Sequence, residues 1–180
     1  KFTDYLEGRK NTPVHFLGAM VLDLKQPPTT HVEKRQVIDG QQRLTTLQIF
    51  LAAFRDFCNE HNCNELAVEC EPFTINKGMM ANPSVDKFKV WPTQLDRTQF
   101  MDVISAQSKS EIERRHPLVR RKYARKFDSR PRMVEAYIFF YEQFSEFFIG
   151  TESDPPLVNE RPLSNRLEEC FQALKNALYV

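Results

Sequence analysis

Residues 37–47 read Val37-Ile38-Asp39-Gly40-Gln41-Gln42-Arg43-Leu44-Thr45-Thr46-Leu47. The apolar pair at the start leads into an Asp-Gly turn signal, and a helical pattern begins directly afterwards. Apolar residues then recur at three- and four-residue steps, which places on one helix face Leu44, Leu47, Leu51, Phe54 and Cys58. The segment therefore predicts a strand, a tight turn and the start of a helix. Such a turn directs backbone N–H groups and the positive end of the helix dipole to one point, where an anion can bind.

Two interpretations of this turn are open. In the first, Asp39 is an ordinary N-cap, Gln42 completes a capping box and Gly40 only supplies the turn. In the second, the turn is an anion site. This explains Arg43, because a cation in the first helical turn opposes the dipole at a cost of roughly 0.3–1 kcal/mol. It also explains the poor helix formers Thr45 and Thr46, whose hydroxyl groups lie within reach of a ligand at this position.

The flanking sequence predicts an α+β fold. We expect a helix ending near residue 9, a strand over 14–24 that is buried on both faces, and a strand over 33–38. The glycine at position 18 permits close approach of a ligand or of another element. Downstream, the pattern predicts a helix over 41–60, strands over 73–76 and 87–91, a polar break over 107–110, and helices over 96–105, 132–149 and 163–178. These elements form a small mixed sheet followed by a helical part. We expect the chain to divide into an α+β part with the motif over 1–107, and a basic linker with the helical part over 108–180.

Three segments resemble the GmrSD-type domain family. Residues 39–43 match its DGQQR motif, residues 15–22 resemble its preceding strand, and a further recurring segment resembles Val90-Trp91-Pro92-Thr93 with Asp96, Arg97 and Phe100. The resemblance implies a ParB/sulfiredoxin-like fold and a nucleoside triphosphate that is bound and hydrolysed with Mg²⁺. It also implies a defence protein that restricts modified foreign DNA such as that of phages, with an HNH-type nuclease in the same protein or in a partner chain.

The composition is that of a globular domain without a membrane span. Of the 180 residues, 41% are hydrophobic and 27% are charged, and no apolar run is long enough to cross a membrane. The first residues are amphipathic rather than a signal peptide, and the four cysteines form no CxxC pair, so we expect a cytoplasmic location. Both ends resemble interrupted elements, and two family segments, one with a Gln-Arg pair and one with an Asn, are missing. We therefore expect a fragment of a longer protein.

One basic block interrupts a nearly neutral chain. Residues 114–132 hold 9 Lys and Arg against a single Asp, whereas the whole chain has a net charge of +1. The block is either a solvated linker or a surface for nucleic-acid phosphates, and the candidate contacts are Arg120, Arg121, Lys122, Arg125 and Lys126. Trp91 is likewise open to two interpretations, as part of the core or its edge, or as a platform on which a base stacks.

Other catalytic patterns are missing from the sequence. There is no GxxxxGK[ST] loop, GxGxxG, GxSxG or HExxH motif, and no HNH-type His-Asn cluster. Cys58 and His61 have local metal-ligand spacing, but Cys63 and Cys70 do not complete a set, so we predict no metal site formed by side chains.

The leading hypothesis is therefore a nucleotide-handling domain. In it, the N–H groups of Gly40, Gln41 and Gln42 bind phosphate, Arg43 neutralises its charge, and Thr45 or Thr46 contacts its oxygens. Asp39 holds the turn, or positions a water molecule or Mg²⁺, so that Asp39 and Arg43 are the candidate catalytic residues. The alternative is a non-catalytic ParB-like nucleic-acid-binding module that uses residues 114–132. A third possibility is a structural domain in which the motif is only a helix cap.

Overall fold

The computed structural model describes residues 15–24, 34–119, 129–150 and 161–179. Its strands are β1 (His15–Phe16), β2 (Val21–Leu24), β3 (Arg35–Asp39) and β4 (Leu178–Tyr179). Its α-helices are α2 (Gln41–Glu60), α3 (Asn64–Cys70), α4 (Pro83–Asp86), α5 (Arg97–Ser105), α6 (Lys109–Arg115), α7 (Arg132–Phe148) and α8 (Leu163–Ala177). Two 3₁₀ helices are η1 (Glu71–Phe73) and η2 (Gln94–Asp96). The predicted α+β class, a small sheet part with a helical part, is confirmed.

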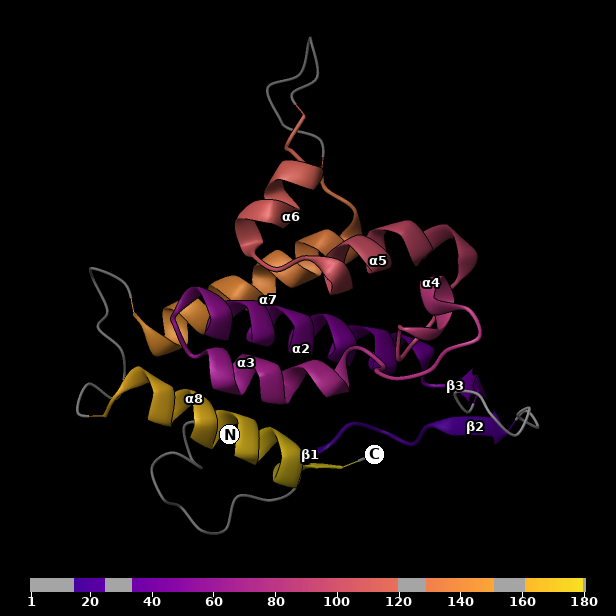
Figure 1. Ribbon diagram of the computed structural model, residues 1–180, viewed down its shortest axis with the longest axis horizontal. Helices are drawn as coiled ribbons and strands as arrows, with labels where there is room; N and C mark the ends of the chain where they lie inside the picture. Colours follow the sequence, from indigo (N-terminus) through magenta and orange to yellow (C-terminus); the bar gives the residue numbers. More distant parts are fainter. Residues whose placement is uncertain (1–14, 25–33, 120–128, 151–160, 180) are drawn as a thin grey trace.

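Helix α2 is the centre of the helical part, and α3, α5 and α7 pack around it (Figure 1). Its apolar face is aromatic and so is the face that α7 turns toward it. Phe54 lies 5.4 Å from Phe144 of α7 and 5.9 Å from Phe171 of α8, measured between ring centroids. Phe57 approaches Tyr141 of α7 at 5.4 Å. The predicted boundaries of α2 are confirmed and the predicted helix over 132–149 is present as α7, because both helices are long enough for their periodicity to be unambiguous.

A buried polar network joins three of these helices. The guanidinium of Arg55 donates to the Asp56 carboxylate at 2.7 Å and to the carbonyl oxygens of Ile104 and Ala106 at 3.1 and 2.6 Å. The Tyr137 hydroxyl of α7 donates to the second Asp56 oxygen at 2.7 Å. Burial raises the pKa of Asp56 to about 6, although Arg55 and Tyr137 oppose this shift. The network fixes α2 against the end of α5 and against α7.

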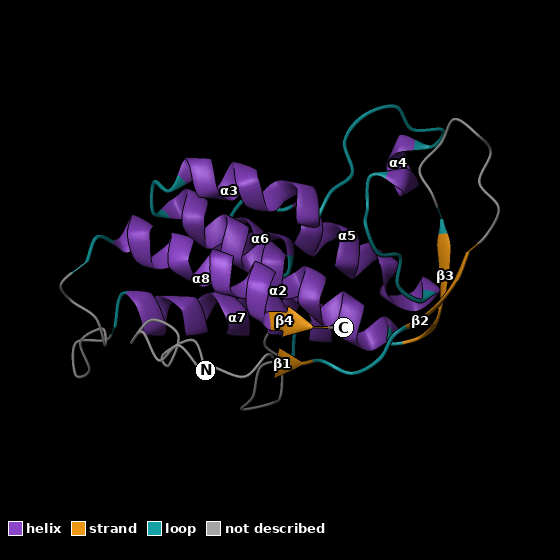
Figure 2. Cartoon of the chain, turned by 90° about the horizontal axis from the view of Figure 1, so that it is seen from below, coloured by secondary structure: helices purple, strands orange, loops and turns teal. Residues whose placement is uncertain are grey.

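The strands form two separate pairs in the described residues (Figure 2). Strands β2 and β3 are antiparallel, with Leu22 opposite Val37, and β1 pairs in parallel with β4. The expectation of one continuous strand over 14–24, buried on both faces, is wrong. Gly18 adopts a φ of +103° and separates β1 from β2, and the side chains of β2 are exposed, including Val21 at 50% and Leu24 at 57%. The cause is that no second layer covers the β2–β3 pair in the described residues, whereas an apolar run by itself only indicates that burial is possible.

Two further differences concern short elements. The predicted polar break at 107–110 contains the start of α6, where the Ser108 hydroxyl accepts from the Glu111 N–H and caps the helix. The capping pair Ser108 and Glu111 was the sequence signal for this helix. The predicted strands over 73–76 and 87–91 are reduced to a single antiparallel bridge between Ile75 and Phe88. Phe73 belongs to η1 instead, and α4 lies in the connection.

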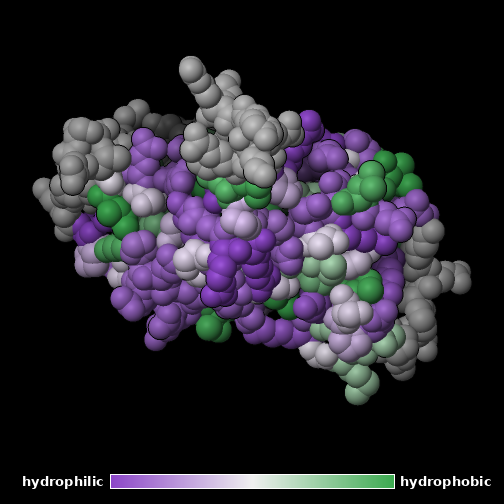
Figure 3. Space-filling view, turned by 90° about the horizontal axis from the view of Figure 1, so that it is seen from above, coloured by the Kyte–Doolittle hydropathy of each residue, from purple (hydrophilic) through white to green (hydrophobic). Residues whose placement is uncertain are grey.

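The upper surface of the molecule over α5, α6 and α7 is mostly hydrophilic, with hydrophobic side chains in separate patches (Figure 3). None of the helices within the described residues is both long enough and apolar enough to cross a membrane. The division into 1–107 and 108–180 stays a prediction.

Candidate functional site

The DGQQR motif lies where β3 passes into α2. Asp39 is the last residue of the strand, Gly40 adopts a left-handed conformation with a φ of +96°, and the helix begins at Gln41. Asp39 is therefore not the N-cap, and no side chain caps the helix. The predicted capping box of Asp39 with Gln42 is wrong, because the left-handed glycine allows the strand to continue through Asp39 and itself takes the N-cap position.

The start of α2 offers N–H donors that have no acceptor within the helix. The first backbone bond of the helix runs from the Leu44 N–H to the Gly40 carbonyl oxygen at 3.0 Å. The N–H groups of Gln41, Gln42 and Arg43 precede it and have no acceptor within the helix. The first turn carries no acidic side chain. This end of α2 is thus electrostatically suited to an anion.

Arg43 lies beside these donors. Its guanidinium donates to the Asp39 carboxylate at 3.0 Å in an i, i+4 pair, and the side chains of Arg43 and Asp39 are 36% and 69% exposed. The guanidinium also packs against the backbone of Gly18, where a Cβ atom would overlap with it. The close approach that Gly18 permits is therefore that of the Arg43 side chain. The ion pair is open to solvent, whereas Gly40 itself is buried and the Met20 side chain packs against it.

The two threonines of the motif differ in their surroundings. Thr45 is 4% exposed, whereas Thr46 and Gln42 are exposed. Within this part of the chain, the hydroxyl group of Thr46 is therefore the more accessible to a ligand from solvent.

A cavity of about 470 Å³ adjoins the motif. It lies between the β2–β3 pair, the first turn of α2 and the segment before η2, and its described lining comprises Leu22, Arg35, Gln36, Val37, Gln41, Leu44, Lys89, Val90 and Trp91. Two cations and no carboxylate belong to this lining. Arg35 and Lys89 are not among the site residues predicted from the sequence. Lys89 alternates with the apolar residues Phe88 and Val90, whereas Arg35 stands between Lys34 and Gln36 and no such pattern marks it.

Trp91 is held in place from several sides. The Gln41 side-chain amide donates to the Trp91 carbonyl oxygen at 3.4 Å, and Phe88 lies 5.5 Å from the indole between ring centroids. The guanidinium of Arg97 lies over the ring at 5.1 Å. The three segments that resemble the family, around Gly18, Gln41 and Trp91, thus meet at one place although they are far apart in sequence.

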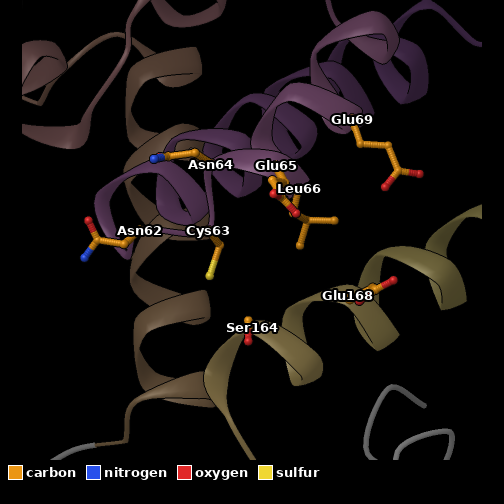
Figure 4. Close-up of a pocket in the computed structure, with 8 residues that line it drawn as sticks. All are labelled: Asn62, Cys63, Asn64, Glu65, Leu66, Glu69, Ser164 and Glu168. Atoms are coloured by element: carbon orange, nitrogen blue, oxygen red, sulfur yellow. The ribbon is translucent and has the colours of Figure 1, made fainter.

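A second cavity, of about 500 Å³, lies between α3 and α8 (Figure 4). Glutamates Glu65, Glu69 and Glu168 line it together with Cys63 and Ser164, and its described lining contains no cation. Its charge is unsuited to a phosphate. No cluster of His, Cys, Asp and Glu in the described residues could hold a metal ion, and the cysteines of this part are free thiols. Burial raises the pKa of Cys70 and of Cys170 to about 12.

The candidate nucleic-acid contacts Arg120, Arg121, Lys122, Arg125 and Lys126 lie outside the described residues. Of the remaining basic block, Arg115 pairs with Glu111 and Asp102 at the end of α6, and Arg130 donates to the His116 carbonyl oxygen at 2.7 Å. These two cations are engaged within the protein itself.

We expect that Gly18→Ala will displace the Arg43 side chain. The free energy of unfolding should fall only by the cost of the backbone strain at position 18. An alanine is strained at a φ of +103°, which costs on the order of 1 kcal/mol, and its Cβ would push away the flexible end of the Arg43 side chain. Gly78→Ala is a matched control, because Gly78 has the same φ and open space around it. Denaturation should give similar losses for both variants, and only Gly18→Ala should shift the Arg43 Nε–H resonance. An unchanged resonance would argue against the contact.

Comparisons with known proteins identify the family of the chain. No curated protein and no solved structure matches the chain. The family described as the GmrSD restriction endonuclease, N-terminal domain, matches residues 2–175, which is nearly the whole chain. This chain therefore belongs to the family of GmrSD restriction endonuclease N-terminal domains, whose context is the restriction of DNA in defence.

Proposed function

We propose that this domain binds the phosphates of a nucleoside triphosphate at the start of α2 and promotes their hydrolysis. The observation that carries the proposal is the uncapped first turn of α2, with three N–H groups beside the partly exposed guanidinium of Arg43. Backbone donors and the helix dipole favour an anion at this point. The family context makes a nucleotide that controls DNA restriction a suitable anion.

Arg43 can exchange its partner at small cost. An exposed ion pair contributes about 0–1 kcal/mol, so a phosphate with several charged oxygens can replace the Asp39 carboxylate. Asp39 then remains beside the phosphates as an exposed acceptor. A guanidinium forms strong charge-assisted hydrogen bonds with phosphate, and it stabilises the charge that develops during phosphoryl transfer.

The residues present fit a magnesium ion that arrives with the nucleotide. Mg²⁺ is usually held by one or two carboxylates together with the phosphates, and the exposed carboxylate of Asp39 meets this requirement. When bound, the ion would neutralise phosphate charge. Asp39 would bind it or orient a water molecule, and the Thr46 hydroxyl would contact a phosphate oxygen.

The nuclease activity requires a different set of residues. The sequence contains no HNH-type cluster, so we propose that the nucleotide site regulates an HNH-type nuclease elsewhere in the protein or in a partner chain that acts on DNA.

Arg43→Ala is expected to weaken binding of a magnesium–nucleoside triphosphate by about tenfold or more, because it removes a charged hydrogen-bond donor. Its effect on the free energy of unfolding should remain within about 0.5 kcal/mol, since the pair with Asp39 is exposed. Isothermal titration calorimetry measures the first effect and urea denaturation the second.

The matched control is Arg161→Ala, which also removes an exposed arginine, paired with Glu169 at 2.8 Å on α8. This control should bind the nucleotide as the unchanged protein does. Equal affinities of the Arg43 and Arg161 variants would rule out the proposed phosphate site.

A further inference from the structure

We propose that the 470 Å³ cavity beside the motif holds the nucleoside half of the triphosphate, with the base against the Trp91 wall. This inference rests on the proposed function, because it assigns a second subsite to a ligand whose phosphates lie at the start of α2. The cavity falls within the range of about 300–1,000 Å³ that is typical of small-molecule sites.

The cavity is continuous with the proposed phosphate site. Gln41 belongs to both, since its N–H is one of the donors at the helix start and the residue also lines the cavity. Leu44, one turn further along α2, lines the same wall. A ligand with phosphates at the first turn therefore extends directly into the cavity.

The lining has the chemistry that a nucleoside requires. Five of its side chains present apolar surface to a planar base, and these are Leu22, Val37, Leu44, Val90 and Trp91. Gln41 also lines the cavity, and the oxygen of its side-chain amide can accept a hydrogen bond from the polar edge of a base. The cation Lys89 also lines the cavity, and its charge complements the phosphates of the same ligand.

The wall formed by Trp91 is organised before a ligand arrives. The backbone of Trp91 is tied to α2 through Gln41, and its ring is packed by Phe88 and Arg97. A side chain that is already fixed loses little freedom on binding, which favours affinity. Trp91 is only partly buried and lines the cavity, so a base can contact it there without a rearrangement of the loop.

Trp91 is the only tryptophan of the sequence, so its fluorescence reports on this cavity alone. Magnesium complexes of ATP, GTP, CTP and UTP would each be compared with inorganic triphosphate by fluorescence titration and by calorimetry. We expect at least one nucleotide to change the Trp91 emission and to bind about tenfold more tightly than inorganic triphosphate, because stacking and apolar contact with the base add to phosphate binding.

Two variants test the wall itself. Trp91→Leu should reduce the affinity for the preferred nucleotide to that for inorganic triphosphate, while the affinity for inorganic triphosphate stays unchanged. Trp91→Phe should keep most of the nucleotide preference, and it guards against a loss that comes from misfolding. Lys77→Ala is a control variant outside the cavity, since Lys77 is exposed and pairs with Glu71. It should leave the affinities for the nucleotide and for inorganic triphosphate unchanged.

The outcomes separate the two proposals. If all nucleotides bind only as tightly as inorganic triphosphate and leave the emission unchanged, the nucleoside subsite is overturned and the phosphate site stands. If inorganic triphosphate and the nucleotides both fail to bind, the phosphate site is overturned and the subsite falls with it. If a nucleotide binds tightly with no effect of Trp91→Leu, its base lies elsewhere.

Discussion

Replacing Arg55 by alanine should lower the free energy of unfolding by about 3–5 kcal/mol, which is typical when one partner of a buried ion pair is removed. The Arg55 side chain is 4% exposed and that of Asp56 is fully buried. Without the guanidinium, the Asp56 carboxylate keeps only the Tyr137 hydroxyl, and the carbonyl oxygens of Ile104 and Ala106 lose their donor. Each of these groups then stays buried with unsatisfied hydrogen-bonding capacity.

A double-mutant cycle with Asp56→Asn identifies the cause of this loss. The cycle is measured by urea denaturation of Arg55→Ala, Asp56→Asn and the combined variant. If the pair is coupled, the combined variant should lose clearly less than the sum of the two single losses. A loss below about 1 kcal/mol in Arg55→Ala would show that the network contributes little to stability.

The second large effect is expected from Phe54→Ala, which should also lower the free energy of unfolding by about 3–5 kcal/mol. Phe54 is completely buried and joins α2 to both α7 and α8 through its contacts with Phe144 and Phe171. Truncation removes buried apolar surface and leaves a cavity between three helices, which can close only in part. A domain with a total stability of about 5–15 kcal/mol would be severely weakened.

The control for this change is Phe139→Ala on α7. Phe139 is 56% exposed, so its truncation should alter stability by no more than about 0.5 kcal/mol. The measurement is the denaturant midpoint of each variant and of the unchanged protein, provided that the dependence of the unfolding free energy on denaturant has the same slope in all three. Similar losses at both positions would contradict the packing of α2 described above.

The sequence predicts the helices well where their apolar pattern is long. For α2 the predicted and observed residues coincide, and for α7 they differ at one end by a single residue, Ile149. The strands are predicted less well, because burial of a strand depends on which element covers it. Val21 and Leu24 have apolar side chains and are nevertheless exposed.

The site is predictable only in its local part. The strand, the turn and the helix of the DGQQR motif follow from adjacent residues, apart from the exchange of Asp39 for Gly40 as the N-cap. The contact between Gln41 and Trp91 joins residues that are 50 positions apart, and the packing of Arg43 on Gly18 joins two different elements. Neither contact leaves a periodic signal in the sequence, so only the fold shows that these residues lie close together.

The hydrogen bonds of Arg55 also determine which way the beginning of its helix faces. Arg55 follows Arg43 by twelve positions on α2, which corresponds to about 18 Å along the helix axis. Its guanidinium reaches the carbonyl oxygens of Ile104 and Ala106 in one rotational setting of α2, and a turn of the helix by one residue would swing it through about 100°. The direction in which the N–H groups of Gln41 and Gln42 point is therefore fixed by the buried contacts of Arg55, about three turns further along the same helix. It does not depend on the loop that precedes them.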